Sequence, residues 1–220
     1  MKVALTMRTV DAVGYSEPRD AISHDWMHWL ASQSYTPVLL PNAIPDPSAF
    51  LEEQGAEAII LTGGNDAVAR PDGSGDFDPL RNRTEFSAIE WAIEKGRPVL
   101  GVCRGMHMIN LYFGGSMEAE IPAGHVATVH RIDVEEKYRP VYGDEDGIET
   151  NSFHGQGIRP GQLADDLDMV ACSADGLVEA AAHTSLPIFG IQWHPERPNP
   201  SAEFDSVHAR QLFEEGVFWK

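Results

Sequence analysis

Short apolar runs alternate with amphipathic stretches through the first two-thirds of the chain, and this pattern constrains the fold more than any other feature of the sequence. We expect β-strands at residues 2–6, 37–40, 58–61 and 98–102. Strands separated by helices in this way are typical of βαβ units built around a largely parallel sheet. The pattern therefore predicts an α/β domain.

Three helices are expected between and beside these strands. The first is indicated by apolar residues that recur with the spacing of one helix face, namely Ile22, Trp26, Trp29 and Leu30. The second has Asp46 as its N-cap and Pro47 as its first residue, and it ends before Gly55. The third carries an apolar stripe of Phe86, Ile89 and Ile93 and ends at Lys95 and Gly96.

The remaining third of the chain has a different texture. Residues 126–134 alternate in polarity, which predicts an antiparallel strand, and residues 169–172, 177–181 and 187–192 are strand-like. A last helix is expected to contain Phe204, Val207, Leu212 and Val217. We therefore predict one domain over residues 1–220, a three-layer αβα sandwich of the flavodoxin-like kind with a mixed, mainly parallel sheet. Residues 70–78, rich in Gly and Asp, are expected to form a mobile surface loop that could cover a site.

Charge and composition exclude several classes of function. The chain has 16 Lys and Arg against 34 Asp and Glu, a net charge of −18, and no basic cluster, so we expect no nucleic-acid partner. No apolar run approaches the length of a membrane span and no targeting segment precedes the first strand, which predicts a cytoplasmic protein without a membrane partner. Two cysteines, Cys103 and Cys172, exclude a disulfide framework and a Cys-rich zinc site. A homo-oligomer is left open.

The segment from Pro98 to His107 carries the strongest chemical signal. An apolar strand runs through Gly-x-Cys-x-Gly into a helix, which is the cysteine form of a nucleophile elbow centred on Cys103. The sharp turn exposes the nucleophile above the sheet, and the helix N-terminus favours the thiolate over the thiol. Cys172, inside an apolar strand, is expected to be a small core residue instead.

A thiolate nucleophile needs a base and a group that orients the base. His194 and Glu196 follow a strand-like run and are two residues apart, so at a strand end they can point the same way. A double glycine after the strand at 58–61 can present a backbone N–H to an oxyanion, and the amide of Arg104 would be the second donor. Taken alone, each motif is also explained by an inert buried cysteine or by an ordinary turn.

Together, four blocks in order resemble a known family. They are Leu-Thr-Gly-Gly-Asn-Asp at residues 61–66, Pro-Val-Leu-Gly-Val-Cys-Arg-Gly-Met-His-Met-Ile-Asn at 98–110 with Gly-Gly at 114–115, Asn-Ser-Phe-His-Gly-Gln at 151–156, and Gln-Trp-His-Pro-Glu at 192–196. The chain resembles a class I glutamine amidotransferase-like domain, and within that group its peptidase C26-like γ-glutamyl hydrolase branch, which includes γ-glutamyl-γ-aminobutyrate hydrolases. Residues 15–22 are similar to a subgroup feature of the γ-glutamyl-CDP-amidate hydrolase type.

The resemblance implies roles for particular residues. It implies a catalytic triad of Cys103, His194 and Glu196, and an oxyanion hole at the amides of Gly64 and Arg104. The substrate-binding residues that it implies are Gly63, Asn65, His107, Ser152, Phe153, His154 and Gln156. The chain departs from the family in having His107 where Gln is common, and Gly155 where the hydrolases often have a second His.

Three functions remain open at this stage. The first is a free-standing hydrolase that releases glutamate from a small γ-glutamyl compound through a thioester, without a metal or cofactor. The second is the glutaminase subunit of an amidotransferase, which would deliver ammonia to a separate synthetase partner, and the third is a catalytically silent domain. Arg19, Arg81 and Arg83 are candidates for binding an anionic leaving group, and each could equally form an ion pair. His125 and His130 are expected to be structural, and His107 to lie either at the site or on the surface.

Overall fold

The architecture is described from a computed structural model, which describes residues 1–219. Within these residues, nine strands form one mixed sheet with the order β4-β1-β5-β6-β11-β10-β9-β7-β8. In chain order they are β1 (Lys2–Thr6), β4 (Thr36–Leu40), β5 (Ala58–Leu61), β6 (Val99–Val102), β7 (Val126–Val134), β8 (Gly147–Phe153), β9 (Leu167–Ser173), β10 (Val178–His183) and β11 (Ile188–Ile191).

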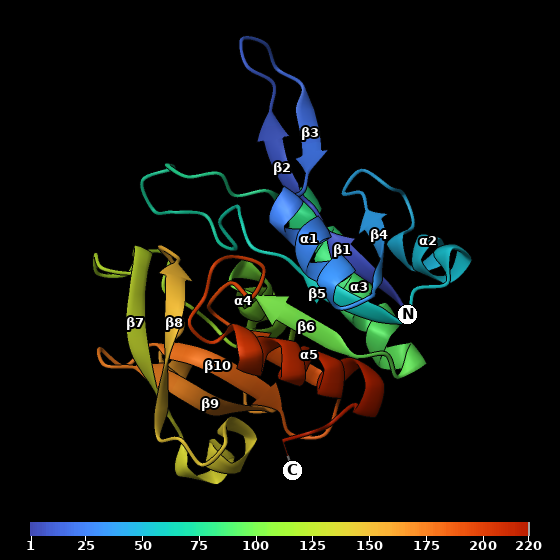
Figure 1. The fold of residues 1–220 in the computed structure, drawn as a ribbon. Helices are drawn as coiled ribbons and strands as arrows, with labels where there is room; N and C mark the ends of the chain where they lie inside the picture. Colours follow the sequence, from blue (N-terminus) through green and yellow to red (C-terminus); the bar gives the residue numbers. More distant parts are fainter. Residues whose placement is uncertain (220) are drawn as a thin grey trace.

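The sheet has a parallel half and an antiparallel half. The strands from β4 to β11 pair in parallel, and those from β11 to β8 pair antiparallel. The mixed, mainly parallel core sheet predicted from the sequence is therefore confirmed, and Figure 1 shows β5 and β6 of the parallel half and β10 and β9 of the antiparallel half. The carboxyl ends of β5, β6 and β11, where such sheets bind ligands, carry the chemical motifs.

Helices cover both faces of the sheet. They are α1 (His24–Ser32), α2 (Pro47–Gln54), α3 (Pro79–Lys95), α4 (Arg104–Tyr112) and α5 (Ala202–Glu215), with 3-10 turns η1 (Glu136–Tyr142) and η2 (Pro160–Gln162). Because side chains alternate along a strand, Val3 and Leu5 pack with α1 and α5, while Ala4 packs with α2, α3 and α4 on the other face. The result is the predicted three-layer sandwich. No helix in residues 1–219 is both long and apolar enough to cross a bilayer.

The helix boundaries follow the capping signals. Asp46 caps α2 by accepting a hydrogen bond from the Ala49 amide at 2.9 Å, and Gly55 ends the helix with φ of +65°, as the sequence indicated. Ile22 was wrongly placed in the first helix, which starts only after the N-cap Ser23. Val217 likewise lies beyond the end of α5, because the backbone turns at Gly216 with φ of +83°.

One hairpin and one further strand have no counterpart in the sequence prediction. β2 (Arg8–Asp11) and β3 (Pro18–Ala21) form a hairpin that projects from the body of the molecule (Figure 1), and its polar residues show no alternation that would predict strands. β8 was also missed, although its last residues belong to the block at residues 151–156. The hairpin and β8 both border the site described next.

Candidate active site

Cys103 sits at the sharp turn between β6 and α4. Its φ of +54° is unusual for a residue with a side chain, and its amide donates a hydrogen bond to the Ile191 carbonyl at 2.8 Å. The turn aims the thiol away from the strand direction, at the N-terminus of α4. This is the geometry of the elbow that the sequence predicted.

The glycines on either side of Cys103 are required by packing. A Cβ at Gly101 would lie 2.7 Å from the carbonyl carbon of Gly105, and a Cβ at Gly105 would collide with the carbonyl oxygen of Leu61. The first turn of α4 therefore packs directly against β5 and β6. This close packing leaves no room for a side chain on either side of Cys103, so the Gly-x-Cys-x-Gly pattern requires both glycines.

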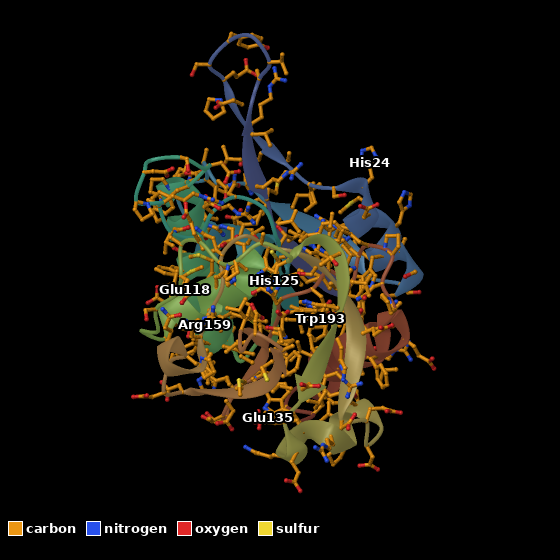
Figure 2. The ribbon with its side chains drawn as sticks, turned by 90° about the vertical axis from the view of Figure 1, so that its left-hand side faces the viewer. His24, Glu118, His125, Glu135, Arg159 and Trp193 are labelled. Atoms are coloured by element: carbon orange, nitrogen blue, oxygen red, sulfur yellow. The ribbon has the colours of Figure 1, made fainter. Side chains whose placement is uncertain are left out.

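His194 and Glu196 follow β11 and point the same way. The Nδ1 of His194 lies 2.7 Å from Oε1 of Glu196, and both side chains are 2% exposed. Asn151 in β8 holds the segment, because its amide nitrogen donates to the His194 carbonyl and its oxygen accepts from the His194 amide, each at 2.9 Å. Figure 2 shows the neighbouring Trp193 within the body of the molecule.

The thiol of Cys103 and the imidazole of His194 shift each other's pKa. Burial raises the pKa of Cys103, but a hydrogen bond to His194 and the charge of that imidazole outweigh burial, and the net pKa is lowered. Burial lowers the pKa of His194, but its hydrogen bonds to Cys103 and Glu196 raise it to about 9. The pair thus favours a thiolate beside an imidazolium.

The Gly63–Gly64 turn after β5 closes over this pair. A Cβ at Gly63 would lie 2.7 Å from Cε1 of His194 and 3.4 Å from Cβ of Cys103, so only glycine leaves room for the two side chains to face each other. Gly64 has a φ of +84°, and Gly64 and Arg104 both line the cavity onto which Cys103 opens. No alternative residue at 63 keeps this spacing.

A buried ion cluster of Arg81, Glu85 and Arg104 supports the turn from below. Arg81 donates hydrogen bonds to the carbonyls of Thr62, Gly63 and Gly64, and to Glu85 at 3.0 Å. Glu85 also pairs with Arg104 and accepts from Thr6 at 2.8 Å. Burial lowers the pKa of Arg81 only to about 10, so the guanidinium remains charged. Of the two roles left open for Arg81, the structure shows the ion pair, because the turn and Glu85 bind its guanidinium.

The cavity onto which Cys103 opens has a volume of about 270 Å³. His107, Phe153 and His154, three of the predicted substrate-binding residues, line it. His107 is buried, not on the surface, and its Nε2 lies 2.8 Å from Oε1 of Gln192. Burial lowers the pKa of His107 to about 3, so this imidazole is neutral. Arg197 stacks on Phe153 with its guanidinium carbon 4.3 Å from the ring centre.

The other predicted substrate-binding side chains are engaged within the protein. Asn65 bonds to the backbone of Thr9 and to Asp76. Gln156 accepts from the Ala67 amide and donates to the Val68 carbonyl, each at 2.9 Å. Ser152 donates to the His125 carbonyl at 2.7 Å. Asn65 and Gln156 still line the cavity, while Ser152 does not, so these three side chains shape the site more than they offer free groups to a ligand.

A second cavity, of about 650 Å³, adjoins the first and shares Asn65 and Asp76 with it. The hairpin β2–β3 forms one wall and the loop before α3 forms another. Four carboxylate side chains line it, those of Asp11, Asp20, Asp76 and Asp78, and no Lys or Arg of the described residues does. Residues 70–78, expected to cover a site, do border both cavities, and Arg70 anchors this loop to Asp66 at 2.8 Å.

The remaining charged and thiol residues lie elsewhere. Arg19 is exposed on the hairpin and pairs with Glu17 at 2.6 Å, and Arg83 is exposed on α3. Cys172 lies in β9 as predicted, but it is only partly buried and is not a core residue.

The sequence did not predict Glu85 and Asn151 as the side chains that hold the site. The only available signal for Glu85 was a charged residue inside the apolar stripe of α3.

Comparisons with known proteins show the family and the fold. The sequence model of the Peptidase C26 family matches residues 3–196. The γ-glutamyl-CDP-amidate hydrolase of Campylobacter jejuni is 28% identical over 205 residues, 90% of this chain and 92% of that protein. The γ-glutamyl-γ-aminobutyrate hydrolase of Escherichia coli K12 is 30% identical over 185 residues, 73% of this chain and 72% of that protein.

Among solved structures, a glutamine amidotransferase from Thermotoga maritima has the same fold. Its TM-score is 0.63 at 17% identity, and the match covers 97% of this chain and 82% of that one. A likeness at this identity concerns the fold alone.

Proposed function

The chain belongs to the Peptidase C26 family, and from this premise we propose that it is a cysteine-dependent hydrolase that cleaves the γ-glutamyl amide bond of a small compound and releases glutamate. The observation that carries the proposal is that the side chains of Cys103, His194 and Glu196 lie in contact in that order. Cys103 at its strained turn faces His194, and Glu196 binds the far nitrogen of that imidazole at 2.7 Å. A nucleophile, a base and an orienting carboxylate are what acyl transfer requires.

In the first half of the proposed reaction, the thiolate of Cys103 attacks the γ-carbonyl carbon and a C–S bond forms. The amides of Gly64 and Arg104 stabilise the negative charge on the carbonyl oxygen. His194 gives its Nε2 proton to the departing nitrogen as the C–N bond breaks, so the leaving group departs as a neutral amine. A γ-glutamyl thioester on Cys103 remains.

In the second half, the same imidazole works as a base. Neutral His194 takes a proton from a water molecule while the water oxygen attacks the thioester carbon. The C–S bond breaks, glutamate departs, and the thiolate–imidazolium pair is restored. Glu196 stabilises the imidazolium in both halves without itself taking up the proton.

The two cavities suggest how the substrate lies. We place the γ-glutamyl group in the smaller cavity, against His107, Phe153 and His154, and the leaving group toward the larger one. The carboxylate lining of the larger cavity favours a leaving group with positive charge and disfavours a nucleotide, whose phosphates it would repel. Its volume also favours a leaving group larger than ammonia, and hence the hydrolase over a glutaminase subunit.

Glutamate release by the purified protein alone tests the proposal. The panel comprises glutamine, γ-glutamyl-γ-aminobutyrate, a γ-glutamyl diamine with a free terminal ammonium, and a γ-glutamyl phosphoramidate nucleotide. We expect turnover of γ-glutamyl amines well above that of glutamine, with the diamine fastest, and no turnover by Cys103→Ala. Turnover of glutamine alone would support the glutaminase alternative with its synthetase partner, and equal inactivity of wild type and Cys103→Ala on every compound would refute hydrolysis.

Asp11→Asn serves as the matched variant for the leaving group. Asp11 is exposed at the tip of β2, so its substitution leaves the core intact. We expect it to raise KM for the diamine about 2- to 5-fold, the effect of one exposed charge, while the value for γ-glutamyl-γ-aminobutyrate does not rise.

A further inference from the structure

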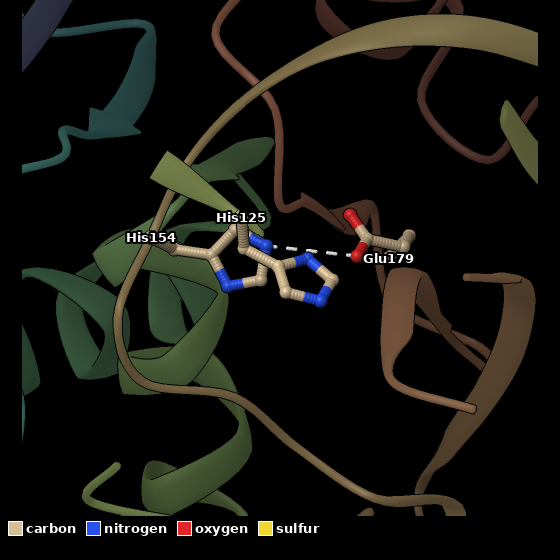
Figure 3. Close-up of side chains that lie close together, drawn as sticks. All are labelled: His125, His154 and Glu179. Atoms are coloured by element: carbon tan, nitrogen blue, oxygen red, sulfur yellow. Dashed lines mark ion pairs between the residues drawn. The ribbon is translucent and has the colours of Figure 1, made fainter. Parts of the chain in front are cut away.

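Three buried ligand-bearing side chains meet beside the proposed active site. They are His125, directly before β7, His154, directly after β8, and Glu179 in β10, and they are 7%, 3% and 1% exposed. One ring nitrogen from each imidazole and one carboxylate oxygen lie within 4.8 Å of one another. Figure 3 shows the two rings and the carboxylate facing a common point.

Glu179 has no hydrogen-bond donor for either carboxylate oxygen among residues 1–219. The nearest nitrogens are Nε2 of His154 at 3.6 Å and Nε2 of His130 at 3.7 Å, both beyond hydrogen-bond length. A fully buried carboxylate without a hydrogen-bond donor is unfavourable, so such groups occur where a cation compensates them. The carboxylate therefore points to a positively charged ligand.

Both imidazoles have one nitrogen engaged by an acceptor outside the cluster. Nε2 of His125 lies 3.1 Å from the carboxylate of Asp175, and Nδ1 of His154 lies 2.9 Å from the carbonyl of Gln156. A ring nitrogen next to such an acceptor carries the proton, which leaves a lone pair on the opposite nitrogen. Those opposite nitrogens, Nδ1 of His125 and Nε2 of His154, are buried and make no hydrogen bond within the described residues. Outer acceptors that orient imidazoles in this way are typical of metal ligands.

We propose that Nδ1 of His125, Nε2 of His154 and the carboxylate of Glu179 bind a divalent transition-metal ion of the zinc type. Imidazole nitrogens favour such an ion over Mg²⁺ or Ca²⁺, which prefer oxygen ligands. Metal–ligand distances near 2.0–2.2 Å require the three groups to draw closer than they now stand. His130, whose Nε2 lies 3.7 Å from Oε2 of Glu179, borders the same group.

An ion pair between His154 and Glu179 does not explain the cluster. Even with the ion pairs from His154 and His130 to Glu179, at 3.6 and 3.7 Å, Nδ1 of His125 stays buried without a hydrogen-bond partner. A metal ion accounts for these atoms, and it joins the start of β7, the end of β8 and the start of β10 at one point. The ion would therefore brace the antiparallel half of the sheet behind His154, which lines the cavity.

Metal binding is measured in the Cys103→Ala protein without a histidine tag, because the Cys103 thiolate and His194 could bind zinc themselves. After removal of metal with a chelator, the protein is titrated with Co²⁺, followed by visible absorption, and with Zn²⁺ by calorimetry. We expect one ion per chain, a Co²⁺ spectrum of a four-coordinate site, and a rise in Tm on Zn²⁺ binding. This background is inactive in hydrolysis, so the result does not depend on the proposed function.

The variants locate the site. His125→Asn and Glu179→Gln should each weaken Zn²⁺ binding by about 100-fold or more, and Asp175→Asn, which removes only the outer acceptor, by about 10- to 100-fold. His24→Ala is the control, since His24 is exposed at the edge of the molecule (Figure 2), and should leave the affinity unchanged. Circular dichroism of each variant confirms that it is folded. Absence of stoichiometric binding, or binding that neither His125→Asn nor Glu179→Gln weakens, would overturn the proposal.

Discussion

Two buried charged clusters flank the proposed nucleophile, and they differ in how well their polar atoms are paired. In the cluster of Arg81, Glu85 and Arg104, both oxygens of the carboxylate have partners, and Arg81 also binds three backbone carbonyls. In the cluster of His125, His154 and Glu179, neither carboxylate oxygen is hydrogen-bonded within residues 1–219. A satisfied cluster supports the backbone, whereas an unsatisfied one is a place for a ligand.

The largest expected effect comes from breaking the paired cluster. Glu85→Gln leaves two buried guanidinium groups without their carboxylate, and neither can lose its proton. We expect the free energy of unfolding to fall by about 3–5 kcal/mol, measured by urea denaturation. Glu90→Gln, at an exposed position of the same helix, is the control and should change stability by less than about 0.5 kcal/mol. Similar losses for the two variants would contradict a supporting role for this cluster.

The next effect tests what the paired cluster holds in place. Gly63→Ala puts a methyl group 2.7 Å from Cε1 of His194 and so separates the imidazole from Cys103. We expect kcat for γ-glutamyl amide hydrolysis to fall by about 100-fold or more, with the fold retained. Gly161→Ala, where no heavy atom lies within 4 Å of the added Cβ, should retain full activity. A fully active Gly63→Ala enzyme would exclude the proposed geometry of the turn.

The pH dependence of the reaction should follow His194 and neither cluster. The pKa of His194 is raised to about 9 and that of Cys103 is lowered, so the thiolate–imidazolium pair persists up to about pH 9. We expect kcat/KM to fall above that pH, because neutral His194 can no longer protonate the leaving amine. Glu196→Gln removes one cause of the raised pKa and should move this alkaline limb to lower pH. If the alkaline fall of kcat/KM occurred at the same pH in Glu196→Gln, it would have to come from the titration of another group.

The smallest effect is expected in the unpaired cluster without metal. Glu179→Gln removes a buried carboxylate that has no hydrogen-bond donor, and imidazoles left beside it can be neutral. After chelator treatment we expect the variant to unfold within about 1 kcal/mol of the wild type, far from the loss in Glu85→Gln. With Zn²⁺ present, the wild type should gain stability over the variant. If Glu179→Gln and Glu85→Gln lowered the free energy of unfolding of the metal-free protein by the same large amount, the two clusters would not differ in the way proposed.

The sequence predicted those parts of the molecule that depend on local pattern. The strands β1 and β5, the caps of α2 and the turn at Cys103 are each fixed by a few adjacent residues, and they were found. The hairpin β2–β3 was missed because polar strands carry no alternation signal.

Long-range pairing explains what the sequence could not predict at the site. Arg81 supports the turn after β5 because α3 lies next to that turn. The side-chain amides of Asn65 and Gln156 are hydrogen-bonded to backbone groups of segments far away in the sequence. Glu179 did leave a signal, since it is a lone acid inside an apolar strand segment. Its partners His125 and His154 are separated from it by at least one strand, so no spacing rule connects the three.

Trapping the acyl-enzyme tests the central proposal most directly. Wild-type protein is mixed with a γ-glutamyl amine, quenched in acid within the first turnovers, and examined by mass spectrometry of the intact chain and of its peptides. We expect an added mass of one γ-glutamyl group on the peptide that contains Cys103, lost on treatment with hydroxylamine and absent from Cys103→Ala. Steady turnover with no adduct on Cys103, or an adduct on Cys172 instead, would contradict the proposed mechanism.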